Sequence, residues 1–116
     1  MTNSWKYSKK TTSKYHNQKV VIDGIKFDSK KEAKRYQELR LLRRAGKIED
    51  LRLQAPYVLI DKSKYGRAIK YIADFVYYDN ELQKEIVEDT KGYRTDVYKL
   101  KKRLMAERYG IEIKEL

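Results

Sequence analysis

The segments 70–78 (KYIADFVYY) and 85–91 (EIVEDTK) contain two aspartates and a lysine whose spacing could hold a metal ion. Both segments are rich in β-branched and aromatic residues and a short polar loop joins them, so they predict two neighbouring antiparallel strands. Side chains alternate between the faces of a strand, which lets Asp74 share one apolar face with Asp89 and Lys91. Two carboxylates ~4 Å apart repel each other by roughly 1 to 4 kcal/mol, depending on the dielectric, unless a cation lies between them. The pattern predicts a divalent metal ion bound by Asp74 and Asp89, with Lys91 beside it.

A structural salt-bridge cluster is the alternative for these three residues. Replacing a buried ion pair with apolar residues is often neutral or stabilising, so stability alone explains the cluster poorly. We therefore favour the metal site. Glu88 points to the other face of its strand, and we expect it at the surface.

A further acidic candidate lies on the first predicted helix, over residues 29–45, which Gly46 should end. Glu32 lies one turn before Tyr36 on the apolar stripe of this helix and should point inward. Residues 29–32 (SKKE) also form a capping box, in which Glu32 could reach back to the Ser29 amide. Helix chemistry alone favours the cap over a role in the site.

Strands account for most of the remaining chain. Residues 20–22 and 25–27 flank Asp23 and Gly24, a dipeptide that fits a type I′ turn, and predict a small hairpin. The only proline, Pro56, predicts a break before a strand over residues 57–61.

A second helix and a last strand complete the predicted fold. Thr95 is a plausible N-cap for a helix over residues 96–109, whose apolar stripe would be Val97, Leu100 and Leu104. A strand over residues 111–115 follows directly, and a strand, a crossover helix and a strand imply parallel pairing. The sequence thus predicts an α/β (α+β) fold in which two helices flank a mixed sheet of three antiparallel strands and one parallel C-terminal strand.

The composition favours a nucleic-acid partner. The chain has 116 residues, and 28 Lys and Arg against 17 Asp and Glu give a formal net charge of +11. Such an excess predicts attraction to a polyanion, with nucleic acid ahead of an anionic membrane surface. No apolar run approaches the roughly 20 residues that span a bilayer, so we expect a soluble, cytoplasmic protein with no membrane association. The absence of cysteine and the single His16 argue against a zinc site, and the glycines match no P-loop or dinucleotide fingerprint.

Residues 1–19 contain five lysines and no acid, with aromatic residues between them. They predict a basic flexible arm ahead of a single domain over residues 20–116. The arm could follow phosphates and stack on bases, or it could be a solvated tail, and both readings stay open. The candidate nucleic-acid contacts are Lys6, Lys9, Lys10, Lys14, Arg94, Lys99 and Lys102.

The predicted order of helix, three strands, helix and strand, with these acidic residues, resembles the core of the PD-(D/E)XK nuclease superfamily, which includes restriction endonucleases. The resemblance covers the chain from Asp28 onward. More closely, five short motifs are similar to those of an uncharacterised family of small phage-encoded proteins. These motifs are 29–32 (SKKE), 46–48 (GKI), 54–56 (QAP), 73–75 (ADF) and 87–92 (VEDTKG).

The resemblance implies roles for individual residues. Asp74, Asp89 and the backbone carbonyl of Thr90 would be metal ligands, Glu32 would complete or orient the site, and Lys91 would position the attacking water. For Glu32 the resemblance favours a role in the site over the helix-capping role. Ala73 stands where the motif has proline, which touches no ligand. Hard oxygen ligands suit Mg²⁺ or Mn²⁺.

The implied activity is that of a metal-dependent endonuclease acting on DNA. A branched or recombination intermediate in phage DNA metabolism, as for a Holliday junction resolvase, is one implied substrate. A junction resolvase would need a homodimer, which the sequence does not establish. Two alternatives stay open: a non-catalytic nucleic-acid-binding protein on the same fold, and an interaction protein that docks an acidic partner.

Overall fold

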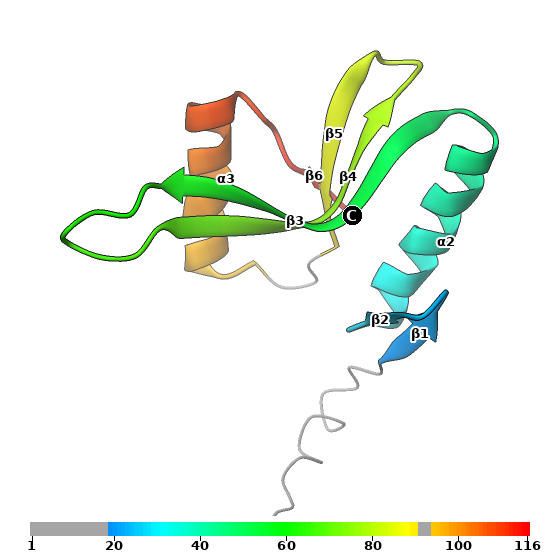
Figure 1. Cartoon of the computed structure of the whole chain (residues 1–116), viewed down its shortest axis with the longest axis horizontal. Coiled ribbons are helices and arrows are strands. Elements are labelled where there is room, and N and C mark those ends of the chain that lie inside the picture. Colours follow the sequence, from blue (N-terminus) through cyan, green and yellow to red (C-terminus); the bar gives the residue numbers. More distant parts are fainter. Residues whose placement is uncertain (1–18, 91–93) are drawn as a thin grey trace, which may run out of the picture. The chain divides into compact units, whose positions relative to one another are not determined.

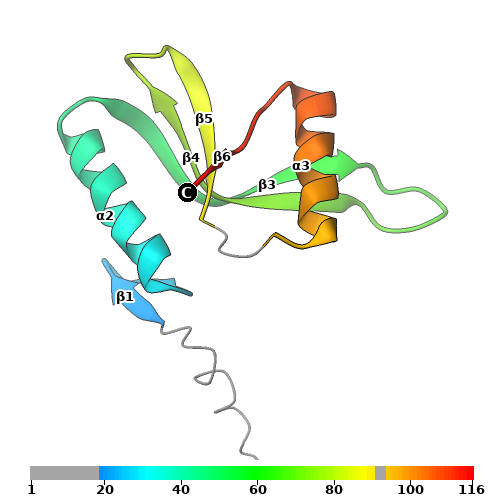
Figure 2. The same cartoon turned by 180° about the vertical axis from the view of Figure 1, so that it is seen from behind.

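The computed structural model describes residues 19–90 and 94–116 (Figure 1, Figure 2). The chain forms two compact units, Met1–Arg40 and Leu41–Leu116, which are described in turn. The described elements run in the order ββαβββαβ, and the mixed α+β class expected from the sequence is confirmed. The expectation of a single domain over residues 20–116 stays a prediction.

The described part of the first unit begins with the expected hairpin. Strand β1 (Val20–Ile22) pairs antiparallel with strand β2 (Ile25–Phe27). The turn residues Asp23 and Gly24 have φ values of 55° and 76°. Two consecutive positive φ values are what a type I′ turn requires, so the dipeptide sets the hairpin.

Helix α2 (Lys30–Arg44) follows. Ser29 caps it, because its Oγ accepts a hydrogen bond from the Glu32 amide at 3.1 Å. The Glu32 carboxylate accepts from the Asp28 amide at 3.2 Å, one residue earlier than a standard capping box. Gly46 stops the helix with a left-handed φ of 79°, as expected.

The second unit contains a sheet with the strand order β3-β4-β5-β6. Strands β3 (Ile48–Ile60), β4 (Ile69–Asp79) and β5 (Lys84–Asp89) are antiparallel neighbours, and β6 (Lys114–Glu115) pairs parallel with β5. The mixed sheet predicted from the sequence is therefore confirmed. The last strand is shorter than the expected residues 111–115.

Helix α3 (Asp96–Tyr109) links β5 to β6 and packs against β3 and β4. Its bounds are those predicted. Thr95 caps the helix by accepting from the Tyr98 amide, and Gly110 ends it in a left-handed conformation. The core shared by helix and sheet consists of Ala55, Leu59, Tyr71, Ala73, Val76, Val87, Tyr98, Met105 and Ile113.

The expected apolar stripe of α3 is wrong in part. Val97 and Leu100 are exposed, and the buried side chains are Tyr98 and Met105, with Leu104 partly buried. A tyrosine ring is as apolar as an aliphatic side chain, and the hydroxyl of Tyr98 finds a carboxylate partner in Glu115. The helix can therefore turn its tyrosine rather than its valine toward the sheet.

The expected break at Pro56 is also wrong. Strand β3 runs through Pro56, which is the register partner of Ile72. A proline lacks an N–H and is tolerated where no neighbouring strand needs that donor. Since β3 is an edge strand of this sheet, one of its sides has no partner strand.

Candidate active site

The register of β4 and β5 brings the two predicted metal-binding aspartates together. Val76 pairs with Val87 and Phe75 with Glu88, so the register continued by one residue sets Asp74 opposite Asp89. Directly opposed residues in an antiparallel pair project to the same face of a sheet. On that continued register Asp74 and Asp89 face one region from two neighbouring strands, and the charges of both act on Tyr71.

Asp74 fastens the end of β5 to β4. Its Oδ2 accepts hydrogen bonds from the Thr90 amide at 2.9 Å and from the Thr90 hydroxyl at 2.8 Å. Its Oδ1 has a long contact of 3.5 Å with the Gln54 side-chain amide. Asp74 is half-buried, and one of its two oxygens is thus much less engaged than the other.

Asp89 is buried and held by a tyrosine. The hydroxyl of Tyr71, a buried residue of β4, donates to Asp89 Oδ2 at 2.6 Å. Burial raises the pKa of Tyr71 far above its usual value, helped by the hydrogen bond to Asp89 and by the charges of Asp89 and Asp74. Tyr71 therefore keeps its proton and remains a donor, and both carboxylates act on the same hydroxyl.

A third carboxylate, Glu115, adjoins Asp89, and the sequence did not identify it as a candidate site residue. It is the register partner of Asp89 across the parallel β5 and β6 pair. Glu115 accepts from the Tyr98 hydroxyl at 2.7 Å and forms ion pairs with Arg94 at 2.8 Å and Lys102 at 3.3 Å. The hydrogen bond from Tyr98 lowers the pKa of Glu115, as do Lys102 and Arg94. Two of the predicted nucleic-acid contacts, Arg94 and Lys102, are thus gathered next to the aspartates.

The expectation that Glu88 lies at the surface is wrong. Its side chain is fully buried and accepts a short hydrogen bond from the Tyr77 hydroxyl, with Lys114 Nζ 3.9 Å away. Strand β5 lies between β4 and β6, and both neighbours provide a polar partner for this carboxylate. Burial of a charge is tolerated where such partners exist.

The other predicted site residues fall elsewhere. Glu32 belongs to the first unit, where it is buried and takes part in the cap of α2, so its role in the site stays a prediction. Lys91, the predicted water-positioning lysine, lies outside the described residues. The same holds for the arm lysines Lys6, Lys9, Lys10 and Lys14.

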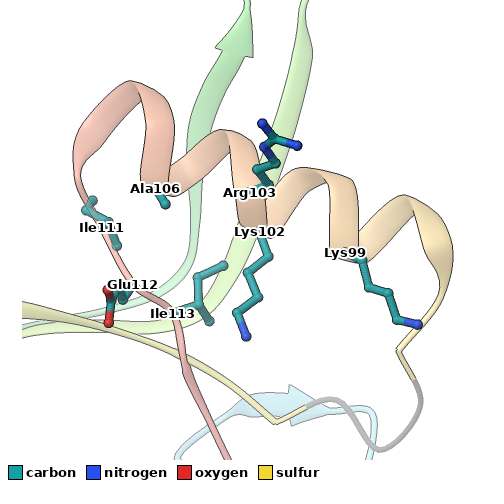
Figure 3. Close-up of a pocket in the computed structure, with 7 residues that line it drawn as sticks. All are labelled: Lys99, Lys102, Arg103, Ala106, Ile111, Glu112 and Ile113. Atoms are coloured by element: carbon teal, nitrogen blue, oxygen red, sulfur yellow. The ribbon is translucent and has the colours of Figure 1, made fainter.

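Lys99 and Lys102 line an open cavity of about 420 Å³ between α3 and the segment leading to β6 (Figure 3). Figure 3 shows Lys102 extending from α3 beside Ile113, the residue that precedes β6. Because Lys102 also reaches Glu115, this basic cavity adjoins the aspartate region.

The oxygen donors fit a hard divalent cation. Asp74 in the middle of β4 is hydrogen-bonded to Thr90, which follows Asp89 at the end of β5. The Asp74 and Asp89 carboxylates and the Thr90 carbonyl are oxygen ligands of the kind that Mg²⁺ prefers. Within residues 19–90 and 94–116, no group of three or more His, Cys, Asp or Glu side chains is arranged to hold a metal. Two side chains with a backbone carbonyl and water molecules are a usual ligand set for Mg²⁺, which keeps several waters.

A family described as "Protein of unknown function (DUF1064)" matches residues 12–115. The chain belongs to this family. No curated protein and no solved structure matches the chain. The DUF1064 match spans all the candidate residues of the folded part, including Glu32, Asp74, Asp89 and Glu115. In the described part of this DUF1064 protein, no helix is long and apolar enough to cross a membrane.

Proposed function

We propose that this DUF1064 protein is a metal-dependent endonuclease of the PD-(D/E)XK type that hydrolyses phosphodiester bonds in DNA. The observation that carries the proposal is the pair of aspartates, Asp74 in the middle of β4 and Asp89 at the end of β5, which lie opposite each other if the register is continued by one residue. Buried Asp89 is held by Tyr71, and Asp74 by Thr90, so both carboxylates have fixed positions.

Each group has a defined task in this proposal. Asp74, Asp89 and the Thr90 carbonyl would hold Mg²⁺ or Mn²⁺, which when bound polarises the scissile phosphate and lowers the pKa of a water. Tyr71 orients Asp89 through a hydroxyl that stays protonated. In the proposal Lys91 positions the attacking water.

Charge supports a polyanionic substrate. The chain carries +11; Arg94 and Lys102 reach Glu115, the register partner of Asp89, and Lys99 lines the same cavity as Lys102. Glu115 neutralises part of that charge and fixes the direction of Arg94 and Lys102. A phosphate that approaches the aspartates would thus meet oriented cations. A branched or recombination intermediate of phage DNA is the substrate we would test first, and a homodimer is part of that proposal.

A panel of labelled linear, flapped and four-way DNA substrates, with and without Mg²⁺ or Mn²⁺, tests the activity. We expect metal-dependent cleavage that Asp89→Asn abolishes, because the substitution keeps the size of the side chain and removes a ligand charge. Binding measured in EDTA should persist, since it depends on lysines and arginines and not on the Asp89 charge.

Asp50→Asn is the matched control, because it makes the same charge change on an exposed residue near the start of β3. This variant should cleave like the wild type. Salt-sensitive binding by the wild type with no cleavage of any substrate would refute the nuclease and support the alternative, a non-catalytic nucleic-acid-binding protein on the same fold. The +11 charge favours that alternative independently of the aspartates.

A further inference from the structure

The turn between β3 and β4, residues 62–67 (KSKYGR), has a chemistry of its own. We call it the basic hairpin tip. In Figure 1 and Figure 2 this hairpin extends past α3, and the tip lies at the far end of its strands. The last register pair before it is Ile60 with Ile69.

Hydrogen bonds give the tip a defined shape. Ser63 and Gly66 form a two-way bridge, with N to O distances of 3.0 Å and 3.2 Å. The amide of Tyr65 donates to Ser63 Oγ at 3.1 Å. These contacts use the backbone of Tyr65 and leave its ring 88% exposed.

The tip combines a ring with positive charge. Lys62, Lys64 and Arg67 contribute three cations with no acid among residues 62–67. Lys64 Nζ lies 5.2 Å from the centre of the Tyr65 ring. The acid that precedes the tip, Asp61, forms an ion pair with Arg108 at 3.5 Å, which offsets its charge. Rings beside cations are how proteins stack bases while contacting the neighbouring phosphates.

The second hairpin of the same sheet provides an internal comparison. The turn between β4 and β5, residues 80–83 (NELQ), carries one acid and no base. Its exposed apolar side chain, Leu82, is 59% exposed and aliphatic. This turn has neither an aromatic ring nor a cation, so the combination of ring and cations belongs to only one of these two turns.

We propose that the basic hairpin tip binds an unpaired segment of nucleic acid, with a base stacked on Tyr65 and phosphates on Lys62, Lys64 and Arg67. A base exposes its flat face only where it is unpaired or at an end, since duplex bases stack on one another. The inference rests on the proposed function in taking nucleic acid as the partner. It gives that function a substrate class, namely DNA with single-stranded regions, such as flaps and forks.

Binding of a fluorescent single-stranded oligonucleotide, followed by anisotropy in EDTA, tests the stacking without cleavage. Tyr65→Ala should weaken binding roughly 5- to 150-fold, the effect of losing one base–aromatic stack. Tyr65→Phe should bind like the wild type, because the ring and not the hydroxyl makes the contact. Leu82→Ala is the control and should change nothing. Lys64→Gln should reduce the slope of log K against log salt by about 0.7, the value for one phosphate contact on a single strand.

Two results would overturn the inference. One is single-strand binding by Tyr65→Ala that equals that of Leu82→Ala. The other is an equal loss of affinity for a circular duplex, which would make Tyr65 a contact without preference for unpaired bases. Thermal melts should show Tyr65→Ala as stable as the wild type, since its ring makes no buried contact.

Failure of the nuclease proposal would look different. A wild type that cleaves nothing with Mg²⁺ or Mn²⁺, while Tyr65→Ala still loses single-strand affinity, would refute catalysis and support stacking. Active cleavage with no effect of Tyr65→Ala on single-strand binding would support the nuclease and refute stacking on Tyr65.

Discussion

The hydrogen bond from Tyr71 to Asp89 should be measurable in both stability and its pH dependence. Tyr71→Phe removes only the hydroxyl, from a residue 3% exposed whose partner Asp89 is 1% exposed. Hydrogen bonds to charged groups contribute about 1.5 to 3 kcal/mol, and the loss leaves a buried carboxylate short of a donor. At about 4 °C per kcal/mol for a domain of this size, Tm should fall by roughly 6 to 12 °C at pH 7.

The loss of stability at alkaline pH is a second, independent measure of the same hydrogen bond. Burial and then the Asp89 hydrogen bond raise the pKa of Tyr71 well above the value of about 10 in an unfolded chain. The folded protein keeps this proton where the unfolded chain loses it, so the stabilisation is complete below about pH 10 and is lost as the pH rises above 10. Each such group removes up to about 1.4 kcal/mol of stability per pH unit in that range. Tyr71→Phe should flatten this loss.

Urea unfolding at pH 7, 9, 10 and 11 measures both effects. The matched control is Tyr78→Phe, on the same strand but exposed, which should follow the wild type at every pH. Some alkaline loss should persist in Tyr71→Phe, because burial also raises the pKa of Tyr57 to about 12. A Tyr71→Phe variant as stable as Tyr78→Phe, with the slope of the wild type above pH 10, would refute the reasoning.

Further predictions concern charge. Without metal, Asp89→Asn and Asp74→Asn should leave Tm unchanged or raise it, because carboxylate repulsion is relieved, whereas Lys91→Ala should lower Tm. Thermal melts with and without Mg²⁺ check this. Aspartate variants that are destabilised and whose melts do not respond to metal would indicate a structural salt-bridge cluster. Removal of residues 1–19 should reduce the slope of log K for duplex DNA binding against log salt by about 0.9 per lost phosphate contact. An unchanged slope would mean that residues 1–19 contact no phosphates. The Tyr98 hydrogen bond lowers the pKa of Glu115, so the stability that Glu115 contributes is present above its unfolded pKa of about 4.3 and is lost as the pH falls below it. In Glu115→Gln, the free energy of unfolding measured in urea should therefore fall less steeply toward low pH. An unchanged pH dependence would contradict this.

Local signals in the sequence specified most of the elements. The Asp23 and Gly24 turn, the Ser29 cap and the Thr95 cap fixed β1, β2, α2 and α3, because turn and cap chemistry acts over a few residues. The period-two pattern around Asp74 and Asp89 predicted that their carboxylates share a face, and their role as a metal site stays a prediction.

What the sequence did not reveal depends on contacts between distant segments. Glu88 is buried because Tyr77 and Lys114 lie beside it, and Glu115 joins Asp89 through a parallel pairing of only two residues. No periodicity encodes such partners. The inward face of α3 likewise followed from Tyr98 finding Glu115, which outweighed the more aliphatic stripe.

Strand β3, which runs through Pro56 at one edge of the sheet, bears on how copies of this chain could associate. Its backbone has left-handed φ values at Asp50 and Gln54, a register shift between Glu49 and Arg52, and no N–H at Pro56. A strand added from another chain needs a continuous row of free donors and acceptors, which these interruptions deny. The opposite edge, β6, offers only two residues. Association through the edges of this four-stranded sheet is therefore disfavoured, and we expect copies of the chain not to extend it strand by strand.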